Sequence, residues 1–194
     1  VRRPALHVSD ALKTHMDRQE SYHFDTLSDK AGELDRLIRQ ARAAEALELG
    51  TLKRIGLRSG DTILDLGSGP GITSLVLARH FPDAAIIGVE PDWELRTQAE
   101  AAAQKQTLDN CKFLEGTAQD IPLANRSVDF AYARLLFQHI PDPLDILAEM
   151  KRVTRPGGIA CVLDVDDGTI FIHPESPGWQ TVEARVARAQ ALFG

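Results

Sequence analysis

Ten consecutive residues predict a strand, a glycine loop and the start of a helix: Thr62-Ile63-Leu64-Asp65-Leu66-Gly67-Ser68-Gly69-Pro70-Gly71. The apolar residues before the loop are typical of a strand that is covered on both faces. The glycines at alternate positions let a ligand approach the main chain, because glycine has no Cβ. From Ile72 to His80 the apolar residues recur with a helical period. The segment therefore predicts the opening of a nucleotide-type βαβ unit.

The spacing of these glycines separates one ligand class from another. A dinucleotide fingerprint, G-x-G-x-x-G, needs glycine at position 72, where this chain has Ile72. No lysine follows the glycines, so the phosphate-binding P-loop pattern is absent as well. The chain instead has G-x-G-x-G, led by the acid Asp65. For this loop taken alone, a glycine-rich turn without a ligand is the alternative interpretation.

Strands and helices alternate along the rest of the chain. Apolar runs predict strands at residues 62–66, 84–89, 111–115, 128–133 and 159–165. Periodic apolar residues predict helices from residue 32, over 43–55, 72–80 and 93–106, and from 143 and 177. In the helix over 43–55 we expect Leu47 and either Thr51 or Leu52 to point inward, and the charged residues, Glu48 among them, to form a solvated face. Residues 155–158 are expected to break the helix that begins at 143. This alternation predicts an α/β fold, a doubly wound and mostly parallel Rossmann-like sheet with helices on both faces. We expect residues 1–56 to form an N-terminal helical cap segment and residues 57–194 to form a single core domain.

Length and composition are those of an ordinary globular domain. The chain has 194 residues, of which 43% are hydrophobic and 26% charged, and this suits one domain. The net charge of −6 argues against a general nucleic-acid binder. No apolar run approaches the roughly 20 residues of a membrane helix, and no secretory signal pattern is present. Cys111 and Cys161 lack paired metal-ligand spacing, so we expect two buried thiols in a reducing cytoplasm and no metal site.

Two acids follow or interrupt the predicted strands where a nucleoside would bind. Glu90 ends the second strand about 20 residues beyond the glycine loop, where a carboxylate can accept both ribose hydroxyls. The alternative for Glu90 is a surface carboxylate at a strand end. Asp65 can accept from a ligand ammonium group, or it can bond to amides of the adjacent loop instead.

Five segments, in order, resemble the motifs of the class I S-adenosylmethionine (SAM) methyltransferases: Asp65–Gly71, Gly88–Asp92, Gly116–Leu123, Ser127–Phe130 and Arg155–Gly158. The nearest members are small-molecule enzymes of the ubiquinone and natural-product type. The resemblance implies SAM as cofactor and methyl transfer to a small-molecule acceptor by in-line displacement. In that family two further strands follow the last helix seen here. We therefore expect a core truncated before its last two strands, with a bare sheet edge that favours self-association.

The resemblance also assigns residues to the cofactor. Gly67 to Gly71 would flank the methionine portion, Glu90 would bind the ribose, and the segment from Thr117 would surround the adenine edge. Arg134 stands where family members face the sulfonium; because a cation is unfavourable there, we expect its backbone at the cofactor and its side chain turned to an acid or to substrate. The full predicted cofactor-binding set is Asp65, Gly67, Ser68, Gly69, Gly71, Glu90, Pro91, Thr117, Ala118, Gln119 and Arg134.

The chemistry of the acceptor side rests on fewer residues. His139 lies just past the fourth strand and is the candidate general base, which is needed only if the nucleophile carries a proton of high pKa. A purely structural role is the alternative for His139. Tyr22 and His23 are candidates for a lid, and His173 for the acceptor pocket, against simple packing roles for all three. The acidic residues from Asp164 onward suggest either a cation site or a solvated loop.

Two alternatives to a small-molecule methyltransferase stay open. One is a non-catalytic SAM-binding domain, and the other is an NAD(P)-linked oxidoreductase, which Ile72 disfavours. Nucleobase amines are not expected as substrates, because the Asp/Asn-Pro-Pro-aromatic sequence of amino-directed DNA methyltransferases is replaced here by Ala133-Arg134-Leu135-Leu136.

Overall fold

The computed structural model describes residues 30–140 and 142–165, together with the isolated positions 178, 181, 185 and 188. The predictions for Tyr22, His23 and His173 lie outside the described residues. Along the chain the elements are α1 (Lys30–Ile55), β1 (Thr62–Leu66), α2 (Ile72–His80), β2 (Ala85–Val89), α3 (Trp93–Lys105), β3 (Cys111–Leu114), β4 (Val128–Arg134), the short 3-10 helix η2 (Phe137–His139), α4 (Pro143–Val153) and β5 (Thr154–Leu163).

The described strands form one parallel sheet in the order β3-β2-β1-β4-β5. The chain moves outward from β1 to β3 on one side and then returns to β1 to add β4 and β5 on the other. The strand order therefore reverses between β1 and β4, which is the point where open α/β sheets bind ligands outside the carboxyl ends of their strands. The predicted doubly wound α/β fold is confirmed.

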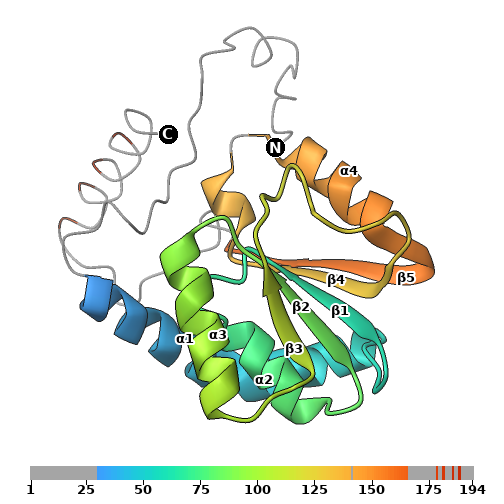
Figure 1. The fold of residues 1–194 in the computed structure, drawn as a ribbon. Helices are drawn as coiled ribbons and strands as arrows, with labels where there is room; N and C mark the ends of the chain where they lie inside the picture. Colours follow the sequence, from blue (N-terminus) through green and yellow to red (C-terminus); the bar gives the residue numbers. More distant parts are fainter. Residues whose placement is uncertain are drawn as a thin grey trace, which may run out of the picture.

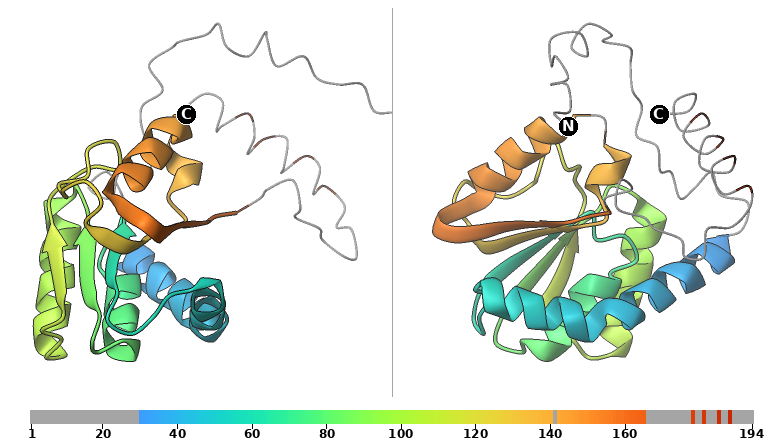
Figure 2. Two further views of the ribbon diagram at one scale, coloured as in Figure 1. Left: turned by 90° about the vertical axis from the view of Figure 1, so that its right-hand side faces the viewer. Right: turned by 180° about the vertical axis from the view of Figure 1, so that it is seen from behind.

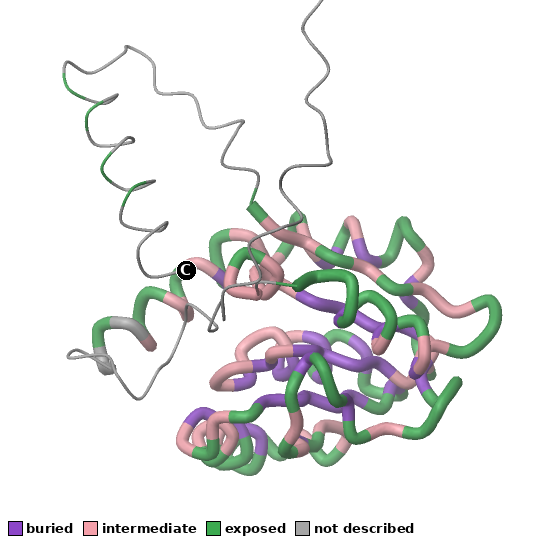
Figure 3. The backbone as a smooth tube through the Cα atoms, turned by 90° about the horizontal axis from the view of Figure 1, so that it is seen from above, coloured by how far each residue is buried: buried purple, intermediate pink, exposed green. Residues whose placement is uncertain are grey.

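Helices cover both faces of this sheet (Figures 1 and 2). On one face α1 and α2 pack through residues such as Leu52 and Leu77 against Ile63 of β1. On the other face α4 packs through Ile146 and Met150 against the sheet and the loop before β4. Because both faces are covered, the central strands are almost continuously buried, as Figure 3 shows for the middle of the molecule.

Three local predictions are corrected. A single helix of 26 residues, α1, replaces the two helices predicted between residues 32 and 55. Its inward face carries Leu49 and Leu52, whereas Leu47, which we expected to point inward, is 73% exposed. Residues 155–158, predicted to break the preceding helix and to come before the fifth strand, are themselves part of β5, and a register shift between Val128 and Phe130 of β4 accommodates the Pro and glycines there. No described helix is both long and apolar enough to cross a bilayer.

Candidate functional site

A cavity of ≈ 670 Å³ lies at the carboxyl edge of the sheet. Every described strand contributes to it through its own end or the residues just after it: Asp65, Glu90, Gly116, Arg134 and Val165. The N-terminal half of α1 forms a further wall. Small-molecule and cofactor sites commonly fall in this range of volume, about 300–1,000 Å³, so the cavity has room for a ligand of nucleoside size.

The glycine loop between β1 and α2 has two different reasons for its glycines. Gly69 has φ 53, and a Cβ there would meet no atom within 4 Å, so this position faces open space in the cavity wall. Gly71 has φ 77, and a Cβ there would come within 2.7 Å of the Ala99 side chain and 2.8 Å of Phe113. Gly71 is not among the residues that line the cavity. It permits close packing of the loop on α3 and β3.

Asp65 lies at the end of β1 with its side chain 2% exposed, and it lines the cavity. Its Oδ2 accepts a hydrogen bond of 2.6 Å from the Ser74 hydroxyl of α2. Burial raises the pKa of the Asp65 carboxyl from 3.8 to about 6, while the Ser74 bond and the nearby Arg134 lower it. Burial of a carboxylate is costly unless a cation or donors compensate for it, so the site favours a positively charged ligand group beside Asp65.

Glu90 follows β2 and is held firmly in the cavity wall. Its Oε2 accepts from the backbone N–H of Gly69 at 2.9 Å, and its Oε1 accepts from that of Asp92 at 3.0 Å. Each carboxylate oxygen keeps a second lone pair for a ligand hydroxyl. Burial raises the pKa of Glu90, and the two backbone N–H groups lower it.

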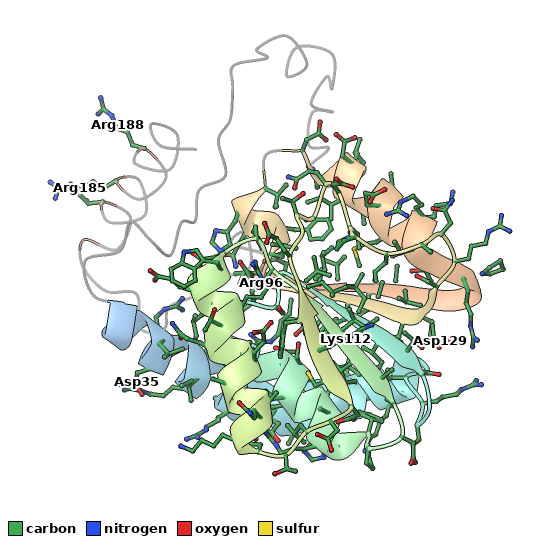
Figure 4. The ribbon with its side chains drawn as sticks, in the orientation of Figure 1. Asp35, Arg96, Lys112, Asp129, Arg185 and Arg188 are labelled. Carbon is green, nitrogen blue, oxygen red and sulfur yellow. The ribbon has the colours of Figure 1, made fainter. Side chains whose placement is uncertain are left out.

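Arg96 of α3, labelled in Figure 4, holds the backbone around Glu90 in place. Its guanidinium donates to the carbonyl oxygens of Glu90 and Pro91 at 2.9 and 3.1 Å, and to the carboxylate of Glu115 at 3.0 Å. One side chain thus joins the ends of β2 and β3, the two strands that carry the ribose-side and adenine-side segments of the predicted site.

Side chains of α4 hold the loop after β3 in place. Thr117 and Ala118 line the cavity, whereas Gln119 does not. Arg152 of α4 donates to the carbonyl oxygens of Ile121 and Leu123 at 2.8 and 2.7 Å. Glu149 of the same helix accepts from the N–H of Ile121 at 3.0 Å. The loop position therefore depends on α4, on the opposite side of the sheet from α1.

His139 lines the cavity from η2, directly after β4. Asp164 holds this turn: its Oδ2 accepts from the backbone N–H groups of Phe137 and Gln138 at 2.7 and 3.2 Å. Asp164 therefore fixes η2, while Asp166 and Asp167, the other acids of the predicted cluster, lie outside the described residues. Leu135, which precedes the turn, has φ 52, and such a value for a branched side chain marks backbone strain at the cavity.

Arg134 turns its side chain to an acid, Glu48 of α1, and the two side chains are 11% and 14% exposed. We had placed Glu48 on a solvated helix face, and that was wrong. The error has a clear cause, since the partner lies on a distant strand and nothing in the local pattern of α1 marks position 48.

The predicted residue Pro91 lines the cavity, and so do several residues that belong to no predicted motif. One of these is Trp93, which is 66% exposed at the start of α3. The α1 wall is formed by Arg36, Leu37, Gln40 and Ala41. Within the described ranges no group of three or more His, Cys, Asp or Glu side chains is arranged to hold a metal ion.

Comparison with known proteins places this arrangement among methyltransferases. The model of a family described as methyltransferase domain matches residues 64–162, which is half of the chain. An uncharacterized methyltransferase of Schizosaccharomyces pombe is 33% identical over 125 residues, covering 61% of this chain and 45% of that protein. The chain therefore spans less than half of that relative's length.

Two further comparisons cover more of the chain. The demethylmenaquinone methyltransferase of Geobacillus kaustophilus is 25% identical over 160 residues, covering 81% of this chain and 68% of that protein. The crystal structure of a SAM dependent methyltransferase from Aquifex aeolicus superposes with a TM-score of 0.64 at 26% identity, covering 75% of this chain and 77% of that one.

Proposed function

This chain belongs to the methyltransferase domain family, and we propose that it binds SAM at the carboxyl edge of its sheet and transfers the methyl group to a small-molecule acceptor. The predicted resemblance to the class I SAM methyltransferases is confirmed at the level of the family. The activity of the whole protein and the residues of the site are proposals, which the contacts described above support.

The residues in the cavity fit SAM. The carboxylates of Asp65 and Glu90 are both buried in its wall, 2% and 7% exposed. A pyrophosphate, as in NAD, would meet the like charge of Asp65 beside the glycine loop, whereas the ammonium of SAM would meet opposite charge. Glu90 would suit the ribose of either ligand. Gly69 leaves open space beside Glu90, so a ligand can approach the main chain. This pairing of two buried acids with an open glycine is the observation that carries the proposal.

Four of the wall residues then have a proposed part in binding. Asp65 would accept from the ammonium group, Glu90 from the ribose hydroxyls, and the backbone of Thr117 and Ala118 would contact the adenine edge. Bound SAM supplies a methyl group on a positively charged sulfur. The protein's contribution is to hold the acceptor in line with that group and to exclude water, since correct orientation alone removes much of such a barrier.

His139 is our candidate for proton transfer. It lines the same cavity, and Asp164 fixes the turn that carries it. We propose that its imidazole takes the proton of an acceptor hydroxyl or similar group of high pKa. Substitution His139→Asn would then lower the turnover number while leaving the dissociation constant for SAM unchanged.

The acceptor is proposed to be a small organic molecule. The demethylmenaquinone methyltransferase relative carries an activity of this kind in its name, and this chain lacks the motif of amino-directed DNA methyltransferases. The net charge of −6 does not favour a nucleic-acid substrate. We further propose a reducing, cytoplasmic setting, in keeping with the free thiols of Cys111 and Cys161, which are half-buried and not fully buried as predicted. Self-association through the β5 edge stays a prediction.

Titration calorimetry with SAM, its demethylated product S-adenosylhomocysteine (SAH) and NAD tests the cofactor. We expect SAM and SAH to bind and NAD not to bind; tight NAD binding alone would overturn the proposal in favour of an oxidoreductase. Incubation with labelled SAM and a panel of quinol, carboxylate and amine acceptors tests transfer. Binding of SAM without transfer to any acceptor would favour a non-catalytic SAM-binding domain.

A further inference from the structure

Glu48 of α1 and Arg134 of β4 form a bidentate ion pair beside the cavity. Arg134 Nε lies 3.0 and 2.8 Å from the two carboxylate oxygens of Glu48, and Nη2 lies 2.8 Å from Oε1. With side-chain exposures of 11% and 14%, the pair is largely removed from water. Charge-assisted bonds of this geometry are stronger and better fixed than exposed ion pairs.

Arg134 shares the cavity with Asp65. In the register of β1 against β4, Asp65 lies opposite Tyr132, so Arg134 is two residues further along the same face of the sheet. Both residues line the cavity, and the charge of Arg134 acts on the carboxyl of Asp65. A ligand cation placed against Asp65 therefore also experiences the field of the guanidinium.

This arrangement poses an electrostatic problem for a positively charged ligand. SAM carries a sulfonium charge that SAH lacks, while the two molecules share the ammonium, ribose and adenine. In a partly enclosed cavity, repulsion between two unit charges is much larger than in bulk water. An uncompensated Arg134 would therefore disfavour SAM specifically, and the nearest compensation that the structure shows is the carboxylate of Glu48.

We propose that Glu48 is a positioning residue of the cofactor site, whose carboxylate neutralises Arg134 and holds its guanidinium on the α1 side so that the cavity accepts a sulfonium. This inference rests on the proposed function, namely that the cavity binds SAM. It gives α1 a part in selecting a charged ligand, in addition to its part in covering the sheet.

Two substitutions that remove opposite charges test the proposal, and the quantity measured is the ratio of SAM to SAH affinity. Glu48→Gln keeps the size of the side chain and removes its charge, so we expect SAM to bind about tenfold more weakly and SAH to change by less than about threefold. Arg134→Gln leaves Glu48 uncompensated, so the ratio should move the other way. The double variant should return to within about threefold of the wild-type ratio, because the two charges are removed together.

Glu45→Gln is the matched control. Glu45 lies on the same helix and, like Glu48, does not line the cavity, but its carboxylate contacts His80 at 3.1 Å and not a residue of the cavity wall. Its ratio of SAM to SAH affinity should stay at the wild-type value. Thermal unfolding of each full-length variant, without ligand, separates loss of the fold from loss of selectivity.

Equal weakening of SAM and SAH by Glu48→Gln would overturn the proposal and reduce Glu48 to a structural support for α1. A shift in the same direction by both single variants would overturn it as well. A wild-type chain that binds neither SAM nor SAH would instead contradict the proposed function itself, so the two failures are distinguishable.

Discussion

The carboxylate of Glu90 accepts hydrogen bonds from two backbone N–H groups and lines the cavity, so a single substitution of this residue should affect ligand binding. We expect Glu90→Ala to weaken SAM binding by about 1–3 kcal/mol, because charge-assisted bonds to the ribose are lost. Calorimetry measures the effect, with Glu100→Ala on the exposed side of α3 as control. An unchanged affinity in a folded variant would mean that the ribose lies elsewhere.

Gly69 and Gly71 form a second residue-level comparison, since both have positive φ but only one has a crowded Cβ position. Gly71→Ala should lower the free energy of unfolding by the left-handed strain of about 1–2 kcal/mol and by an overpacking cost of about 1–3 kcal/mol. Gly69→Ala should show only the strain, and should weaken SAM binding by crowding the ligand. Urea unfolding and calorimetry give the two numbers; equal stability losses would contradict this assignment.

Asp65 makes binding depend on pH. Its pKa is raised by burial from 3.8 to about 6, so it is largely protonated below that pH in the free protein. Because the carboxylate form attracts the SAM ammonium, affinity should rise as pH increases from about 5 to about 7, and Asp65→Asn should reduce that slope.

The raised pKa of Asp65 gives stability a pH dependence opposite to that of SAM binding. The folded-state pKa of Asp65 lies above the unfolded value, so the folded protein holds the proton more tightly. Its contribution to the free energy of unfolding is therefore greatest at low pH and falls, by roughly 3 kcal/mol, as pH rises from about 4 to about 6. Urea unfolding of wild type and Asp65→Asn across this range measures the difference; parallel curves would contradict it.

At the scale of elements, α4 supports the loop that borders the adenine side. Arg152→Met removes the donors to Ile121 and Leu123, so the backbone of residues 116–127 should exchange its amide hydrogens faster. We expect a stability loss of about 1–3 kcal/mol and a modest loss of SAM affinity. Lys151→Met, on the exposed side of the same helix, is the control, and hydrogen exchange is the measurement. Exchange at the wild-type rate in this loop would show that other contacts hold it.

Elements were predictable where their signals are local. The apolar run and glycines of β1 and its loop are contiguous, so the sequence places α2 at Ile72–His80 as the structure does. The inward face of α1 was not predictable in the same way. Glu48 is held inward by a partner 86 residues away, and a helical pattern contains no information about such a partner.

The residues of the site also fall into those with a local sequence signal and those placed only by packing. Asp65, Glu90 and Gly69 belong to motifs of consecutive residues, and the structure brings all three to the cavity wall. Arg36, Gln40 and Trp93 reach that wall only because α1 and α3 pack where they do. The close approach of Gly71 to Ala99 and Phe113 is likewise a property of packing between elements, so a role in packing could not be separated from a role in ligand binding before the fold was known.

For the whole molecule, ligand binding should appear as added stability. A ligand at 100 times its dissociation constant stabilises the folded state by about 2.7 kcal/mol. For a chain of this size that corresponds to a rise of about 5–11 °C in the melting temperature, at about 2–4 °C per kcal/mol. SAM and SAH should both produce this rise, and NAD should produce none. If saturating SAM leaves the melting temperature unchanged, binding of SAM by the folded chain is contradicted.

The parallel sheet has one further consequence for anyone who works with this protein. All of its strands point the same way, so the turns at residues 58–61 and 82–84, which precede β1 and β2, lie at the rim opposite the cavity. A fluorophore or a surface tether attached at an exposed position of these turns, such as Ser59 or Asp83, would report on the molecule or immobilise it while leaving ligand entry unobstructed.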